Sequence, residues 1–377
     1  MNESSISLSP SHNQQRPIAV VKHQGHDETD LSLNHGKPLN ATKDGDSRVY
    51  RMVALDLDGT LLQSNHELAD EQVEYLRRLD AAGVTICIAT GRAPPSVYEH
   101  VKKLALPKPL PVVCSNGARG LLLSFNNNDN EAEITAVSSA EPTLNRNQEE
   151  VFYTPVTGDV VRKTIQLAKK MGYCTQYYLD DGIYANPITS SHHRLLQVYK
   201  DITRSDIVVV EDDFELLING SNDDTPGHRH GLPSKLLVRF EQEEFEKAHE
   251  AFLKMFCPDG PDSPSRLATI IPGFIPAADW FLEILHPDVN KGQGLINMCK
   301  ALKVPIEQTV AMGDGTNDIE FLKLAGLGIA MKNAHPSLKS VADYTMEWTN
   351  DQHGVTKTIK SLRAEGRLIS ETDVIMQ

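Results

Sequence analysis

Two carboxylates separated by one residue directly follow a short apolar run. Residues 52–55 read Met-Val-Ala-Leu, which is typical of a strand buried on both faces of a parallel sheet, and Asp56 and Asp58 come next. Side chains two positions apart in an extended chain point the same way, so the carboxylates are expected to lie together. Two such charges need a cation or a shared proton between them. Asp58-Gly59 could also be an ordinary surface turn or a helix cap, and only the rest of the chain can decide.

Polar residues follow three further apolar runs, at 84–89, 112–114 and 309–312, which we interpret as buried strands. The carboxyl ends of parallel strands meet at one edge of a sheet, where open α/β folds place their ligands. We therefore expect these side chains to converge with the first pair. The candidates are Thr90, Gly91, Arg92, Ser115, Asn116, Asp314 and Asp318.

Four carboxylates at one sheet edge favour a site for a hard cation. Magnesium prefers a few carboxylates together with water and the oxygens of a bound phosphate. Lys291, which opens a helix-like segment, can neutralise one carboxylate and also a phosphoryl group in transfer. The sequence therefore predicts Mg²⁺ as the cofactor, with phosphoryl-transfer chemistry beside it.

Helical patterns separate these strands, and the alternation predicts a doubly wound α/β fold with a parallel sheet. Apolar residues recur at helical spacing in 68–82, and Pro94 and Pro95 suit the first turn of a helix that runs to about 104. Later patterns predict helices at 292–302, 318–325 and 355–362 and short strands at 328–331 and 342–346.

The middle of the chain differs from its flanks in composition and in its mix of predicted strands, helices and loops. This difference predicts an inserted α+β cap domain. Polar stretches rich in glycine and proline predict long loops. Predicted strands are 121–125, 177–179, 236–240 and 280–285, predicted helices are 160–171 and 245–255, and predicted loops are 126–130, 138–150, 219–234 and 258–265. The predicted domains are a disordered extension at 1–48, a core at 49–117 plus 287–368, and a cap at 118–286.

Length, net charge and cysteine content limit the classes of partner that the chain is expected to bind and the compartment in which it is expected to lie. The chain has 377 residues and a net charge of −14, which argues against nucleic acid as a partner. No apolar run approaches the length of a membrane span, and the five cysteines are scattered without any Cys-x-x-Cys pair. We expect a cytoplasmic monomer or homodimer without a disulfide framework, although the extension leaves organellar targeting open. Histidines in the extension and in His228-Arg-His230 are interpreted as solvated loop residues rather than metal ligands.

The ordered motifs resemble those of the haloacid dehalogenase superfamily, and most closely its Cof-type phosphatases, which carry an α/β cap of the C2B type (subclass IIB). The resemblance covers about 49–362. Its motifs are Asp56-Leu-Asp-Gly-Thr60, Ala89-Thr-Gly-Arg92, Ser115-Asn-Gly117, Asn290-Lys-Gly292 and Gly313-Asp-Gly-Thr-Asn-Asp318.

This resemblance implies a role for each matching residue. Asp56 would be the nucleophile that becomes an aspartyl phosphate, and Asp58 would be the general acid and then the base. Dehalogenases of the superfamily lack the second Asp, so Asp58 favours phosphoryl chemistry. Thr90 and Lys291 would hold the phosphoryl oxygens. Asp56, the Asp58 carbonyl and Asp314 would bind Mg²⁺ with Asp318 in support, Asn317 would reach the phosphate, and Gly91, Arg92 and Asn116 would lie beside the substrate at the cap.

The implied activity is a Mg²⁺-dependent phosphatase for a small phosphorylated metabolite such as a sugar phosphate, pyridoxal phosphate or FMN. A phosphomutase of the same superfamily is the alternative, and product analysis separates the two. A non-catalytic scaffold would require the loss of a central Asp or Lys, and all are present. The chain has neither a Gly-x-x-x-x-Gly-Lys loop nor a Gly-x-Gly-x-x-Gly fingerprint after a strand.

Overall fold

The structure is a computed structural model, and it describes residues 48–125, 146–179, 182–203, 205–210, 214, 217–218, 231–275 and 279–369. Several predictions fall outside these residues. They are the extension at 1–48 except for Arg48, the loop at 126–130, His228-Arg-His230, and most of the predicted loops at 138–150 and 219–234.

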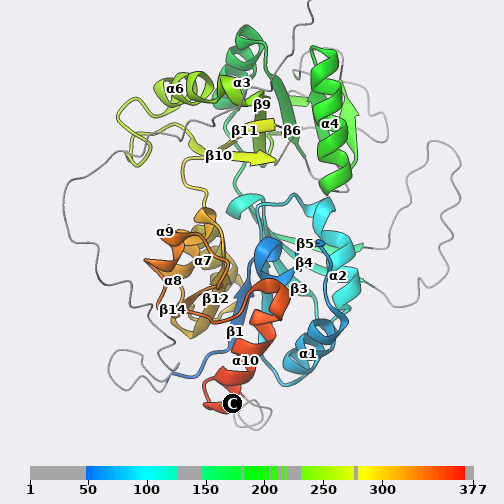
Figure 1. Cartoon of the computed structure of the whole chain (residues 1–377), viewed down its shortest axis with the longest axis vertical. Helices are drawn as coiled ribbons and strands as arrows, with labels where there is room; N and C mark the ends of the chain where they lie inside the picture. Colours follow the sequence, from blue (N-terminus) through cyan, green and yellow to red (C-terminus); the bar gives the residue numbers. More distant parts are fainter. Residues whose placement is uncertain are drawn as a thin grey trace, which may run out of the picture. The chain divides into compact units, whose positions relative to one another are not determined.

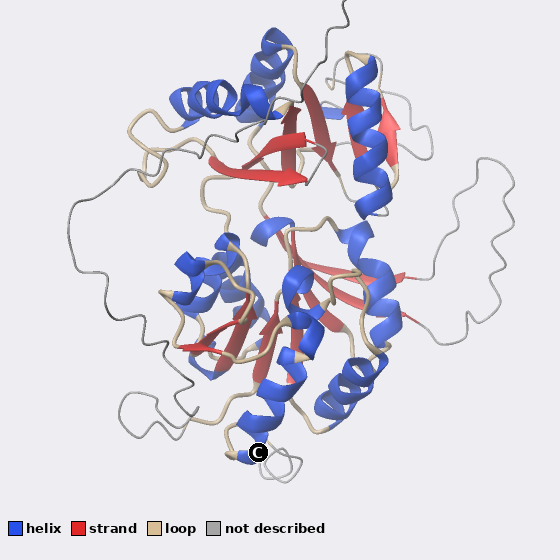
Figure 2. Ribbon diagram, viewed as in Figure 1, coloured by secondary structure: helices blue, strands red, loops and turns tan. Residues whose placement is uncertain are grey.

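An eight-stranded sheet carries the predicted site at one of its edges (Figures 1 and 2). Its first six strands run parallel, and all of the strands predicted for the core are present, which confirms the doubly wound α/β fold. In spatial order the strands are β14 (Tyr344–Thr345), β13 (Leu327–Ala330), β12 (Thr309–Gly313), β1 (Met52–Leu55), β2 (Thr85–Ala89), β3 (Leu110–Cys114), β4 (Arg119–Phe125) and β5 (Arg146–Tyr153).

Two groups of helices flank this sheet. α1 (Asp70–Ala81) packs against α2 (Tyr98–Leu104) and α10 (Gly354–Ala364), while α7 (Lys291–Leu302) packs against α8 (Ile319–Leu324). A further short helix, α9 (Pro336–Lys339), follows β13. The predicted helices are thus present, and Pro94 and Pro95 lie in a separate 3₁₀ turn that precedes α2.

β4 and β5 differ from the expectation that the insert begins at residue 118. β4 pairs antiparallel with β3, and β5 pairs antiparallel with β4, so both strands extend the first sheet. The predicted loop at 138–150 is accordingly wrong for residues 146–150, which belong to β5. Charged residues in β5, such as Glu149 and Glu150, hide its strand character, since they lie at the edge of a sheet where a strand tolerates polar side chains.

A second sheet of six strands follows and is mostly antiparallel. Its spatial order is β10 (Thr269–Ile275), β11 (Asp279–Leu285), β9 (Lys235–Phe240), β6 (Cys174–Tyr178), β7 (Ile183–Asn186) and β8 (Ile207–Val209). The helices in this part are α3 (Gly158–Met171), α4 (Ser190–Thr203) and α6 (Phe245–Phe256). The sequence pattern did not predict β7, β8, β10 or α4.

Each sheet has its own hydrophobic core. One cluster of buried side chains surrounds β1, β2, β3 and β12, and a separate cluster lies between the second sheet and helices α3 and α6. All five cysteines lie in the described part of the chain, where they are buried and form no disulfide with one another. Within the described residues, no helix has the length and apolar character needed to cross a membrane.

Candidate active site

Asp56 and Asp58 lie at the carboxyl end of β1, as the sequence predicts. The backbone N–H of Asp56 still donates to the Met312 carbonyl of the neighbouring strand, so sheet pairing fixes the position of Asp56. The chain then turns through Gly59, whose φ of 73° belongs to the left-handed region that glycine favours. A Cβ atom at this position would lie 2.3 Å from Asp314 Oδ2. Glycine therefore allows the turn after β1 and the loop after β12 to approach each other.

Lys291 connects two buried carboxylates at this point. Its ammonium donates to Asp56 Oδ1 at 2.5 Å and to Asp318 Oδ1 at 2.7 Å, and its side chain is only 1% exposed. Burial lowers the pKa of Lys291, but the charges of Asp318 and Asp56 outweigh that effect and raise the pKa above its ordinary value. The lysine is thus charged, and it holds the Asp56 carboxylate in one orientation.

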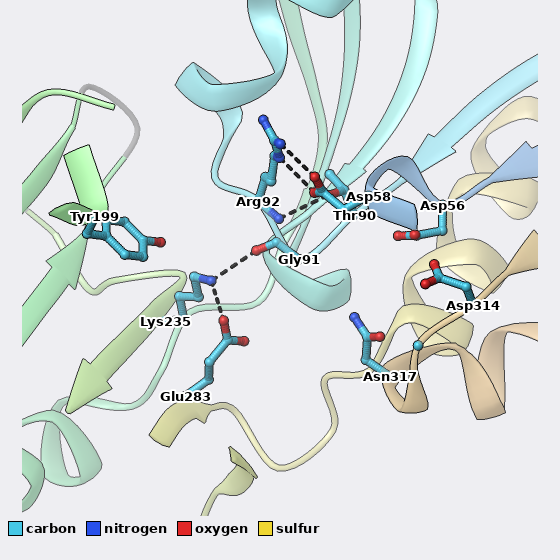
Figure 3. A pocket seen from close by; sticks show the side chains of 11 residues that line it. Asp56, Asp58, Thr90, Gly91, Arg92, Tyr199, Lys235, Glu283, Asp314 and Asn317 are labelled. Atoms are coloured by element: carbon cyan, nitrogen blue, oxygen red, sulfur yellow. Dashed lines mark hydrogen bonds and ion pairs between the residues drawn. The ribbon is translucent and has the colours of Figure 1, made fainter. Parts of the chain in front are cut away.

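Asp318 organises the loop that carries Asp314. Its second oxygen accepts hydrogen bonds from the backbone N–H groups of Asp314 and Gly315, at 3.0 and 2.9 Å. Asp314 in turn accepts a hydrogen bond from the Thr60 hydroxyl at 2.9 Å. Both oxygens of Asp318 are therefore engaged with the protein, whereas Asp314 faces the same space as Asp56 (Figure 3).

The donor set fits a divalent cation. One oxygen from each of Asp56, Asp314 and Asp318 lies within 4.8 Å of the other two. Burial, followed by the charge of Asp318, raises the pKa of Asp314 to about 6, and burial also raises the pKa of Asp56 well above its ordinary value. Three carboxylates with one lysine leave two negative charges, which one divalent cation would neutralise.

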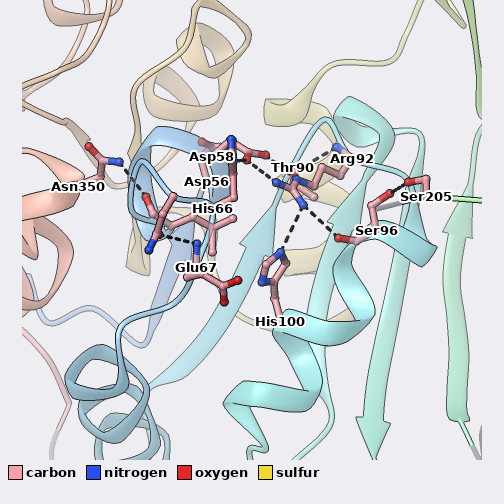
Figure 4. A network of polar contacts seen from close by, with 12 residues as sticks. Asp56, Asp58, His66, Glu67, Thr90, Arg92, Ser96, His100, Ser205 and Asn350 are labelled. Atoms are coloured by element: carbon pink, nitrogen blue, oxygen red, sulfur yellow. Dashed lines mark hydrogen bonds and ion pairs between the residues drawn. The ribbon is translucent and has the colours of Figure 1, made fainter. Parts of the chain in front are cut away.

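Asp58 faces a different partner from Asp56. The guanidinium of Arg92 donates to both of its oxygens, at 2.7 and 2.6 Å, and His66 Nδ1 lies 3.3 Å from one of them (Figure 4). Burial raises the pKa of Asp58, but the hydrogen bonds and charge of Arg92, together with His66, outweigh it and bring the pKa below its ordinary value. Arg92 also donates to the Ser96 carbonyl, which fixes the guanidinium. The Asp58 carboxylate is thus held apart from the carboxylates of Asp56, Asp314 and Asp318.

A pocket of about 260 Å³ opens in front of these groups (Figure 3). Most of the residues predicted from sequence line it, namely Asp56, Asp58, Thr90, Gly91, Arg92, Asp314 and Asn317. Three other predicted residues lie behind this lining. Lys291 and Asp318 are buried beneath Asp56, and Asn116 is buried and accepts a hydrogen bond from Asn317 at 2.9 Å.

Three residues of the second sheet and its helices also line the pocket, and none of them was predicted from the sequence. They are Tyr199 of α4, Lys235 of β9 and Glu283 of β11. Lys235 and Glu283 are charged residues within strands that are otherwise largely apolar. That contrast is the signal in the sequence that could have identified them, since a buried charge is costly unless it is paired.

Comparison with known proteins places the chain in a family. The family model described as haloacid dehalogenase-like hydrolase matches residues 53–134 and 143–359. The chain is 27% identical over 321 residues to the phosphatase YwpJ of Bacillus subtilis, covering 83% of this chain and 99% of that protein. It is 25% identical over 316 residues to the 5-amino-6-(5-phospho-D-ribitylamino)uracil phosphatase YitU of the same organism, covering 82% and 96%.

Solved structures agree at the level of the fold. A haloacid dehalogenase-like hydrolase from Bacteroides thetaiotaomicron superposes with a TM-score of 0.61 at 21% identity, covering 83% of this chain and 99% of that one. A sugar phosphatase of haloacid dehalogenase subclass IIB gives a TM-score of 0.57 at 22% identity, covering 83% and 99%. The chain belongs to the haloacid dehalogenase-like hydrolases, and the prediction of a Cof-type phosphatase within this family is confirmed.

Proposed function

We propose that the protein is a Mg²⁺-dependent phosphatase that hydrolyses a small phosphorylated metabolite through a phosphate ester of Asp56. One observation carries this proposal. Asp56 and Asp58 line the same small pocket, but each is held by a different cation, Lys291 or Arg92. Two carboxylates in different environments can take the two roles that the reaction needs, those of nucleophile and proton carrier.

In the first step an Asp56 oxygen attacks the phosphorus atom, and the bond from phosphorus to the leaving alcohol breaks. Lys291 holds the carboxylate for this attack, which reduces the entropy lost in reaching the reactive geometry. The leaving oxygen takes a proton from Asp58, so the reactive form is the one in which Asp58 is protonated, although Arg92 lowers the pKa of this carboxyl in the free site. Thr90 lines the same pocket as the carboxylates, and its hydroxyl accepts from the Arg92 backbone N–H at 3.1 Å, so its O–H is available to donate to a phosphoryl oxygen.

In the second step a water molecule attacks the same phosphorus atom and gives a proton to Asp58. The bond between phosphorus and the Asp56 oxygen breaks, which releases phosphate and restores both carboxyl groups. Asp58 thus returns to the protonation state in which it began. Arg92 fixes its position in the pocket during both steps.

Mg²⁺ would be held by Asp56 and Asp314 and by the backbone carbonyl of Asp58. Asp318 would support this set through its bonds to the Asp314 loop. When bound, the ion supplies neutralisation of the negative charge on the phosphoryl oxygens. Lys291 is buried beneath Asp56, so its contribution is to balance the charge of the carboxylates from below.

The experiment that tests this proposal compares phosphate release by the wild type and Asp56→Asn across sugar phosphates, nucleotides, FMN and pyridoxal phosphate. We expect release that requires Mg²⁺, stops with EDTA, and falls at least about 10³-fold in Asp56→Asn. Asp159→Asn is the matched control because Asp159 is exposed on α3. After an acid quench, mass spectrometry should find phosphate on Asp56, and release that persists in Asp56→Asn would exclude the mechanism.

A further inference from the structure

Lys235 and Glu283 form a buried ion pair in the wall of the active-site pocket. The Lys235 ammonium donates to Glu283 Oε1 at 2.7 Å, and the two side chains are only 3% and 12% exposed. Glu283 lies opposite Leu237 in the ladder between β11 and β9, so Lys235, two residues from Leu237, shares its face of the sheet. A buried pair of this kind needs further hydrogen bonds to offset the loss of solvent.

Those further bonds come from residues beside the proposed catalytic groups. Lys235 also donates to the Gly91 carbonyl at 2.9 Å (Figure 3). Asn116 donates to Glu283 Oε2 at 2.6 Å. Asn317, which lines the pocket, donates to Asn116. The pair is therefore tied on both sides to the loops that follow β2, β3 and β12, where the phosphoryl group would bind.

Both cationic side chains that line the pocket are paired with carboxylates. Arg92 is paired with Asp58, and Lys235 is paired with Glu283, so each of these two lining cations already has a carboxylate partner. Beyond the Asp56 and Asp314 region, the wall thus offers hydrogen-bond donors and acceptors without excess positive charge. A leaving group with hydroxyls finds partners there, whereas a leaving group with a second anion meets the Glu283 carboxylate.

Tyr199 gives this wall a fixed shape. Its hydroxyl accepts a hydrogen bond from Tyr178 at 2.8 Å, and the guanidinium of Arg239 lies 4.7 Å from the centre of its ring. The Lys235 ammonium in turn lies 4.9 Å from the centre of the Tyr178 ring. Rigid aromatic rings beside a donor and an acceptor are suited to a small polar ligand in a pocket of about 260 Å³.

We propose that Lys235 and Glu283 form a specificity pair that selects uncharged, hydroxylated leaving groups and rejects leaving groups that carry a second anion. The substrates would be monophosphates of small polyols or sugars. The proposal rests on the proposed phosphatase function and identifies which residues of the second sheet select the substrate. It also disfavours a mutase that handles bisphosphates, because such an enzyme needs an unpaired cation for the second phosphate.

The test uses two open-chain substrates of similar size, sorbitol 6-phosphate and 6-phosphogluconate, which differ at C1, where the second compound has a carboxylate in place of a hydroxymethyl group. Glu283→Gln keeps the shape of the side chain but leaves Lys235 without a counter-charge, and its NH2 group replaces one of the two oxygens that accept from Lys235 and Asn116. We expect the ratio of kcat/KM for the anionic substrate to that for the neutral one to rise at least about tenfold. Lys235→Met leaves Glu283 without its cation, and the same ratio should fall.

The double variant Lys235→Met with Glu283→Gln should lose the gain of the single glutamine variant, because the wall is then neutral again. Glu243→Gln is the matched control, since Glu243 is exposed and lies outside the pocket. Circular dichroism confirms that each variant is folded. A purely structural role for the pair would lower kcat/KM for both substrates alike and leave the ratio unchanged.

The outcomes separate this inference from the proposed function. A wild type that releases phosphate from no compound of the panel contradicts the phosphatase itself. A wild type that is active but prefers the anionic substrate overturns the specificity pair alone. The pair is also excluded if the two folded single variants shift the ratio in the same direction or do not shift it.

Discussion

At the scale of single residues, Lys291 is a buried cation that pairs with two carboxylates of the site. It lies between Asp56 and Asp318, and all three side chains are almost fully buried. Removing one partner from such a cluster leaves the other charges unpaired in a poorly solvated place, which costs more than the pair contributed. Lys291 is therefore important for folding as well as for the chemistry.

We expect Lys291→Met to lower the free energy of unfolding by about 3–5 kcal/mol, because Met matches the length of Lys but leaves two carboxylates without their cation. Urea denaturation in EDTA measures this loss without a contribution from bound metal. Lys300→Met on the exposed side of the same helix should change stability by less than about 0.5 kcal/mol. Equal midpoints for the two variants would contradict the bridging role.

The residues that could be predicted from sequence are those next to strand ends. Asp56 and Thr90 directly follow apolar runs and Asp314 directly follows β12, so the topology of a parallel sheet alone brings them together. Lys235 and Glu283 could not be found in this way. They reach the pocket only through the pairing of β9 with β11, and no local spacing records that pairing in the sequence.

At the scale of elements, the N-terminal turn of α7 approaches the end of β3 very closely. Gly294 makes this approach possible, since a Cβ atom there would lie 2.6 Å from Val113 Cγ1 and 2.7 Å from Gly117 Cα. Helix propensity alone predicts that Gly→Ala within a helix stabilises by up to about 1 kcal/mol. Packing predicts the opposite sign, because backbone at Gly117 cannot move aside as a flexible side chain can.

We expect packing to prevail, so that Gly294→Ala lowers the free energy of unfolding by about 1–3 kcal/mol. Because Lys291 lies one turn earlier on α7, displacement of the helix should also lower kcat. Lys300→Ala tests the propensity effect alone on the exposed face of α7 and should change stability little. Thermal unfolding and turnover of both variants check this, and a Gly294→Ala protein more stable than the wild type would refute it.

Some strands in and beside the insert could not be predicted from the pattern of apolar and polar residues. β4 has the apolar run of a strand, but nothing in its own residues says that it joins the first sheet rather than the second. β5 was hidden by its charges, and β10 by a central Pro272-Gly273 that usually marks a turn. The buried parallel strands were predicted well because an apolar run with no alternation has few other interpretations.

At the scale of the whole molecule, the two hydrophobic clusters share no side chain. Cys87, Cys114 and Cys299 belong to the first cluster, and Cys257 belongs to the second. Polar contacts such as those of Lys235 and Asn116, and a small apolar cluster that contains Ala93 and Leu237, connect the two parts near the pocket. Since hydrophobic burial dominates folding stability, we expect the two cores to unfold as separate cooperative units.

The buried cysteine thiols can be used to measure whether the two cores unfold separately. Burial raises the pKa of Cys114 to about 12 and also raises the pKa of Cys257, so the reactive thiolate is scarce and shielded in the folded protein. A brief pulse of alkylating reagent at increasing urea, followed by mass spectrometry, should label Cys257 and the three cysteines of the first core at different midpoints. Coincident midpoints would mean that the polar contacts and the small apolar cluster between the two cores join them into one cooperative unit. The specificity pair would then belong to a wall as rigid as the catalytic sheet edge.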